Sequence, residues 1–256
     1  MLGETKMHLG VLLSPLPTLA EPQALGRQAV HFEQLGYHTL WTAQASGRGF
    51  MMTDPLLALA TAAAVTDRIR LGTAVLQLPL YQPAALAHSI FSLQQLCGDR
   101  LLLGLGTGST ATDFAVFGQS FEQRFKRFNQ SLVEFKQLLE GGDSSVELTP
   151  WPEVSGGPPL LLGSWGNNVE TAAREFDGWI ASAHYRSHSE IALAAGAYHK
   201  AGGQQAIVST IQLDKDTDLG ELRDRLLAFA GVGFKEAAVM FLPGGPDPEQ
   251  VIRLLE

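Results

Sequence analysis

A turn rich in glycine, serine and asparagine is the first segment whose residue types suggest chemistry. It spans Gly163–Asn168 (GSWGNN) and lies between a short apolar run and a stretch with helical periodicity. Free backbone N–H groups at a helix N-terminus, together with hydroxyls and amides, form an anion site whose usual ligand is phosphate. The alternative is a simple turn in which an asparagine caps the helix.

A second glycine-rich turn follows an earlier apolar run. Gly104-x-Gly106-x-Gly108 closes the segment LLLGLGTGS, and such glycines let the backbone approach a ligand closely. The motif is not the dinucleotide fingerprint, whose third glycine comes one residue later. It resembles the first motif of Rossmann-like methyltransferases, but that motif belongs near the first strand of a sheet, and here three strand–helix units precede it. A methyltransferase is therefore kept as a minor alternative.

Few side chains near the predicted strand ends can transfer a proton. His184 is the only histidine at the carboxyl end of a predicted strand, which makes it the best titrating candidate, with an exposed loop histidine as the alternative. We find no carboxylate pair for glycoside hydrolysis, no His/Asp cluster for a metal and no strand-end lysine for a Schiff base. The chain is therefore either a non-enzyme or a protein whose organic cofactor does the chemistry.

The elements that must position these residues alternate between short apolar strands and amphipathic helices. We expect strands over 8–13, 39–42, 69–76, 101–105, 160–162, 179–181, 206–213 and 237–242. Asp54-Pro55 and Asp247-Pro248 each predict a helix start, and Asp218 predicts another. A helix with Phe121, Phe125, Phe128, Leu132, Phe135 and Leu139 on one face is expected to pack that face into the core. Eight such units predict a parallel (β/α)8 TIM barrel, an α/β fold, with an open doubly wound sheet as the rival.

Composition limits the class of protein further. The 256 residues are 45% hydrophobic and 17% charged, which excludes disorder and suits one domain over residues 1–256. Eighteen basic against 26 acidic residues give a net charge of −8, so nucleic acid is not an expected partner. No apolar run is long enough to span a bilayer, and the single Cys97 fits a reducing compartment. We expect a cytoplasmic protein without a membrane partner.

Several segments, taken in order, resemble the bacterial luciferase-like monooxygenases. They are GYHTLW (36–41), DPLLALA (54–60), TDRIRLGTAV (66–75), PAALA (83–87), GDRLLLGLGTG (98–108), DFAVFG (113–118), LLLGSWGNN (160–168) and FDGW (176–179). Each motif is weak alone, but the order and spacing cover nearly the whole chain. The resemblance implies a (β/α)8 barrel that binds reduced FMN, or the related deazaflavin, at its mouth. It also implies a homodimer, a small-molecule substrate and a flavin reductase that supplies the reduced cofactor.

The same resemblance assigns candidate cofactor-binding residues. They are Thr73, Ala74, Val75, Gly106, Thr107, Gly108, Arg124, Ser164, Gly166, Asn167 and Asn168. The first three match a strand segment that lines the isoalloxazine ring and often carries a non-proline cis peptide, and the next three match a turn under the cofactor. Arg124 matches a phosphate-pairing arginine, with Arg127 as a substitute. The last four match the phosphate loop, in agreement with the anion site above. No metal is implied.

The chain departs from the family after the second predicted strand. There the family usually carries an acid followed by a catalytic histidine, but this sequence has Gln44 and Ala45, neither of which moves a proton at pH 7. Gln44 and His184 are the candidate catalytic residues. We predict an FMN-using monooxygenase acting on a small organic substrate. The alternatives are a deazaflavin-dependent hydride-transfer enzyme on the same barrel and a flavin-binding protein without turnover.

Overall fold

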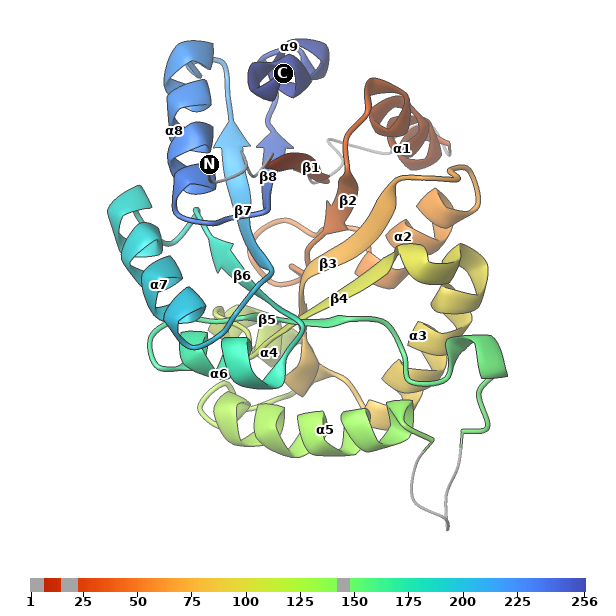
Figure 1. Ribbon diagram of the computed structural model, residues 1–256. Coiled ribbons are helices and arrows are strands. Elements are labelled where there is room, and N and C mark those ends of the chain that lie inside the picture. Colours follow the sequence, from red (N-terminus) through yellow and green to blue (C-terminus); the bar gives the residue numbers. More distant parts are fainter. Residues whose placement is uncertain (1–6, 15–22, 142–147) are drawn as a thin grey trace.

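The chain folds into a closed barrel of parallel strands, as the alternation predicts (Figure 1). The computed structural model describes residues 7–14, 23–141 and 148–256. Within these ranges eight strands pair in sequence order, and β1 also pairs with β8, so the ring is closed and the open sheet is excluded. The strands are β1 (His8–Leu12), β2 (Thr39–Thr42), β3 (Arg70–Gln77), β4 (Leu101–Gly106), β5 (Leu160–Gly163), β6 (Gly178–Ser182), β7 (Ala206–Leu213) and β8 (Glu236–Phe241).

Most of the helices lie around the outside of the barrel, and the short helix over residues 111–116 lies across its end (Figure 1). The helices are α1 (Ala24–Leu35), α2 (Pro55–Ala63), α3 (Pro83–Cys97), α4 (Ala111–Val116), α5 (Arg124–Leu139), α6 (Asn168–Glu175), α7 (His188–Lys200), α8 (Leu219–Gly231) and α9 (Pro248–Ile252). The predicted caps are confirmed, since Asp54, Asp218 and Asp247 each accept a hydrogen bond from a backbone N–H in the first turn. The apolar stripe of Leu25, Ala29 and Phe32 predicts a first helix from about Glu21 to Leu35. Its predicted end is confirmed, and its predicted start lies outside the described residues.

The aromatic stripe on α5 is only partly buried, which corrects the sequence-based expectation. Phe128 and Phe135 are buried in the core between the barrel and its helices, but the Phe125 side chain is 49% exposed. Phe121 precedes the helix, which begins at Arg124. The spacing therefore predicted the inner face correctly from Phe128 onwards and overestimated its length by a turn.

A tryptophan and a carboxylate fill the barrel interior towards the amino ends of the strands. The Trp41 indole is fully buried, and its Nε1 donates a hydrogen bond of 2.6 Å to Oε1 of Glu236, which is 3% exposed. Thr39 donates to the other carboxylate oxygen at 3.0 Å. Space for the indole comes from glycines, since a Cβ on Gly72 would lie 2.4 Å from the Trp41 ring and one on Gly10 only 2.7 Å from it. The interior is therefore closed at the amino ends of the strands.

Strand β3 contains a bulge near the carboxyl end of the barrel. Thr73 pairs with Leu103 and Leu76 with Leu105, so two residues of β3 face one residue of β4. The peptide bond between those two residues, Ala74 and Val75, is cis, at the place that the family resemblance indicates. A Cβ on Gly104 would lie 2.0 Å from the Thr73 carbonyl oxygen, so only glycine fits opposite this bulge.

We predict that the Trp41–Glu236 pair contributes strongly to stability. Trp41→Phe removes the donor to a buried carboxylate oxygen and leaves a cavity, so the free energy of unfolding should fall by about 3 kcal/mol. Urea denaturation measures this change. Trp151→Phe is the matched control, because the Trp151 side chain is 48% exposed and its replacement should cost less than about 0.5 kcal/mol. Equal losses in the two variants would contradict the assignment.

Candidate active site

A cavity of about 770 Å³ opens at the carboxyl ends of the strands. Active sites of this fold lie at that face, and the volume falls within the range of roughly 300–1,000 Å³ for small-molecule and cofactor sites. Every strand, or the loop after it, supplies part of the wall. The wall includes Gln44, Ala45, Arg48, Phe50, Met52, Ala74, Val75, Gln77, Gly106, Thr107, Gly108, Ser109, Gly163, Ser164, Trp165, His184, Tyr185 and Arg186.

The β3 bulge and two glycines form one wall of the cavity. Val75 packs so closely on the neighbouring strands that a Cβ on Gly106 would lie 2.6 Å from one of its methyl groups and a Cβ on Gly163 2.7 Å from the other. Ala74 lines the cavity beside Val75. Thr73 does not line it, because its buried hydroxyl donates to the Gly104 carbonyl oxygen at 2.8 Å. The glycines that end β4 and β5 therefore make room for Val75 of β3.

The predicted phosphate loop is only partly within the cavity. Ser164 lines the cavity, and its hydroxyl donates to the Asn168 carbonyl oxygen at 3.1 Å. Gly166, Asn167 and Asn168 are exposed at the N-terminus of α6 and do not line the cavity. Asn167 occupies the N-cap position, but its side chain makes no capping hydrogen bond. The Asn167 side chain therefore does not cap the helix in the way that the simple-turn alternative predicts.

Arg124 lies away from the cavity wall. Its guanidinium stacks on the Phe121 and Phe125 rings, 3.8 and 4.3 Å from their centroids, and Nη1 donates to the Phe121 carbonyl oxygen at 2.9 Å. Arg186, which the sequence did not single out, does line the cavity and stacks 4.7 Å from the centroid of Trp165, next to Ser164. Arg186 also pairs with Glu190 at 3.5 Å.

Both candidate catalytic residues line the cavity, in different settings. Gln44 is fixed, because its Oε1 accepts a hydrogen bond of 2.8 Å from the Gln77 backbone N–H. The Gln77 amide Nε2 donates to Asp113 at 2.8 Å and to the Gln44 carbonyl oxygen at 3.3 Å, which leaves Gln77 Oε1 buried without a partner among the described residues. His184 is exposed at the rim, with its ring edge-on to Tyr185.

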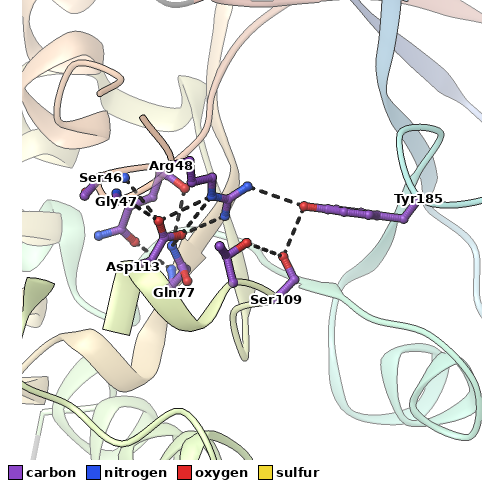
Figure 2. A network of polar contacts seen from close by, with 9 residues as sticks. Ser46, Gly47, Arg48, Gln77, Ser109, Asp113 and Tyr185 are labelled. Atoms are coloured by element: carbon purple, nitrogen blue, oxygen red, sulfur yellow. Dashed lines mark hydrogen bonds and ion pairs between the residues drawn. The ribbon is translucent and has the colours of Figure 1, made fainter. Parts of the chain in front are cut away.

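A buried carboxylate on α4 joins that helix to the loop after β2 and to the end of β3 (Figure 2). Asp113, on α4, is fully buried and accepts hydrogen bonds from the Ser46 and Gly47 backbone N–H groups. Arg48 donates to its Oδ2 from Nε at 3.1 Å and from Nη2 at 2.7 Å. Burial alone would raise the pKa of Asp113, but the hydrogen bonds from Arg48, Gln77 and the backbone outweigh it, and the pKa is lowered.

The same arginine reaches across the mouth of the cavity. Arg48 Nη1 lies 3.4 Å from the Tyr185 hydroxyl, which in turn lies 3.1 Å from the Ser109 hydroxyl (Figure 2). Burial would lower the pKa of Arg48, but the bond to Asp113 outweighs it and raises that pKa, so the guanidinium stays charged. Sequence reasoning missed this arginine and gave Asp113 no role of its own, since neither residue ends a strand.

The cavity wall is cationic or neutral. Its titratable side chains among the described lining residues are Arg48, Arg186, His184 and Tyr185, and none of them is a carboxylate.

Within the described ranges, no three histidine, cysteine or acidic residues cluster closely enough to hold a metal ion. No helix in the same ranges has the length and apolar character needed to cross a bilayer.

The fold and this cavity define an α/β barrel with a cofactor-sized site. The chain belongs to the luciferase-like monooxygenase family, whose model matches residues 7–239. It is 34% identical over 155 residues to a 4-hydroxyprotoasukamycin monooxygenase of Streptomyces nodosus subsp. asukaensis, a match that covers 58% of this chain and 42% of the relative. The matched segment is thus less than half of that protein.

Solved structures with the same fold differ in their cofactors. Monooxygenase RslO1 from Streptomyces bottropensis has a TM-score of 0.77 at 17% identity, covering 97% of this chain and 96% of that one. A coenzyme F420 dependent tetrahydromethanopterin reductase from Methanopyrus kandleri has a TM-score of 0.74 at 15% identity, covering 98% and 97%. The oxygenating constituent of 3,6-diketocamphane monooxygenase from Pseudomonas putida, in complex with FMN, has a TM-score of 0.67 at 18% identity, covering 89% and 72%.

We predict that Asp113→Asn lowers stability in a pH-dependent way. The variant removes the carboxylate that Arg48 and two backbone amides bind, so the free energy of unfolding at pH 7 should fall by roughly 3 kcal/mol. Because the pKa of Asp113 is lowered in the folded chain, its stabilisation is complete above about pH 4 and declines as the pH falls towards the folded-state pKa.

Urea denaturation of both proteins at pH 7 and pH 3 measures this difference. The gap between wild type and variant should narrow at pH 3. The exposed Asp99→Asn on the opposite face is the control and should change stability little at either pH. A gap of the same size at both pH values would mean that the ionised carboxylate is not the source of the stability.

Proposed function

We propose that this protein is a flavin-dependent oxidoreductase, in the form of an FMN-using monooxygenase that acts on a small organic substrate. The observation that carries the proposal is a cofactor-sized cavity at the barrel mouth whose described wall contains no carboxylate. Such a wall has little acid–base capacity of its own, which suits a site where an organic cofactor does the chemistry. The family to which the chain belongs supports the same conclusion.

The residues present fit a flavin. Ala74, Val75 and Gly106 offer a flat wall for a planar ring, and the hydroxyls of Thr107 and Ser164 suit a ribityl chain. When bound in its reduced form, a flavin supplies the electrons that activate oxygen. The chain's residues would bind the ring and exclude water from it.

A deazaflavin-dependent hydride-transfer enzyme is the second candidate. The F420-dependent reductase from Methanopyrus kandleri shares the fold with a TM-score of 0.74, and a flavin and a deazaflavin share a tricyclic ring. FMN is favoured because the described wall offers a single arginine, Arg186, on the Ser164 side, which matches one terminal phosphate. We also propose that a separate flavin reductase supplies reduced FMN and that two chains form a homodimer.

Cofactor titration tests the proposed function. Adding the purified protein to FMN should quench the flavin fluorescence with a micromolar or lower dissociation constant, and F420 should bind more weakly. Reduced FMN bound to the protein, with oxygen and candidate apolar substrates, should then give oxygen uptake that depends on the substrate. Tighter binding of F420 would select the hydride-transfer alternative. Binding of neither cofactor would reject both.

We predict that Arg186 pairs with the cofactor phosphate. Arg186→Ala should weaken FMN binding by about tenfold through the loss of a charge-assisted hydrogen bond, and should leave the affinity for riboflavin, which lacks the phosphate, unchanged. Arg124→Ala tests the residue that the family resemblance assigns to the same task, and Arg223→Ala on the exposed face of α8 is the control. Equal FMN affinities in the Arg186 variant and the control would disprove the assignment to Arg186.

A further inference from the structure

Arg48 has no role in holding the cofactor in the proposal above, yet it is a charged group inside the cavity. Two of its nitrogens, Nε and Nη2, bind the fully buried Asp113 carboxylate. The third, Nη1, faces the mouth of the cavity, where it meets only the Tyr185 hydroxyl at 3.4 Å among the described residues (Figure 2). One edge of the guanidinium is therefore fixed, and the other is available to a ligand.

Apolar side chains from the loop after β2 accompany Arg48 in the cavity wall. Ala45, Phe50 and Met52 from the same loop line the cavity with it. A cation in such a setting attracts an oxygen anion more strongly than it would in water, because the local dielectric constant is low. The guanidinium needs no reorganisation to bind, since Asp113 and the backbone of Ser46 and Gly47 already hold its position.

We propose that Arg48 is a specificity-determining residue that binds an anionic oxygen, such as a carboxylate, on an otherwise apolar substrate. This inference rests on the proposed function, because it places the substrate in the part of the cavity that the cofactor leaves free. The Tyr185 hydroxyl oxygen marks the position that the substrate oxygen takes. Its 3.4 Å contact with Nη1 is long, and an anion in its place would make a shorter and stronger bond. Tyr185 is 53% exposed, which lets it move aside.

Calorimetric titration with naphthoate and with neutral naphthamide tests the inference. The two probes share an apolar body and differ in the charge of one group. In the presence of saturating FMN, the wild-type protein should bind naphthoate at least tenfold more tightly than naphthamide, because a hydrogen bond to a charged group is worth roughly 10- to 100-fold in affinity. The same titrations without FMN give a result that does not depend on cofactor binding.

Two variants of Arg48 and one control complete the test. In Arg48→Lys, the lysine ammonium keeps the positive charge and pairs with Asp113, but it lacks the second edge of donors that the guanidinium turns towards the cavity. The preference for naphthoate should therefore be lost. The double variant Arg48→Met with Asp113→Asn removes both charges and avoids a buried, unpaired carboxylate that would threaten folding. It too should bind the two probes equally. Arg223→Met should keep the wild-type preference.

The outcomes separate this inference from the proposed function. A wild-type protein without a preference for naphthoate, or a double variant that keeps the preference, overturns the role of Arg48. Loss of FMN affinity in the folded double variant together with the loss of preference would assign Arg48 to the cofactor and would also overturn it. A preference that is present without FMN and lost in the variants supports Arg48 even if FMN itself fails to bind, in which case only the proposed cofactor is wrong.

Discussion

The structure of the barrel mouth depends on the ion pair and hydrogen bonds of the fully buried Asp113 carboxylate. A buried charge is tolerated only when it is paired and hydrogen-bonded, and here its partners come from two places in the chain. Arg48 and the backbone of Ser46 and Gly47 come from the loop after β2, and Gln77 comes from the end of β3. These hydrogen bonds thus hold the loop after β2 and the end of β3 against α4, which carries Asp113, at the edge of the cavity.

The interior of the barrel is divided into a filled part and an open part. Trp41 and Glu236 occupy the amino end, where glycines on β1 and β3 give the indole its space. Towards the carboxyl end, the β3 bulge replaces a regular strand edge, and the glycines of β4 accept its close approach. Small residues therefore have opposite effects at the two ends of the barrel. At the amino end they admit a large side chain, and at the carboxyl end they leave a ligand-sized space.

The sequence predicted the parts of this protein that depend on local patterns. Strand and helix alternation predicted the barrel, and the aspartates at helix starts predicted their caps. Side-chain partners far apart in sequence could not be predicted in the same way. Arg48 and Asp113 are 65 residues apart, and neither belongs to a periodic segment that would mark it. A family motif likewise indicated Arg124, but the direction of its side chain depends on the Phe121 and Phe125 rings beside it.

The loop after β2 shows how the chemistry of the site differs from the family pattern that the sequence resembles. Where that pattern has an acid and a histidine, this chain has Gln44 and Ala45. The Gln44 amide holds the end of β3, and further along the same loop Asp113 fixes the charge of Arg48. Neither group exchanges a proton near neutral pH, so the loop can orient and stabilise charge but cannot act as a base. Any proton that the reaction moves must therefore pass through His184, through the Tyr185 hydroxyl, or between substrate, cofactor and water. A substrate that arrives already ionised, with its negative oxygen on Arg48, would need no base from this loop at all.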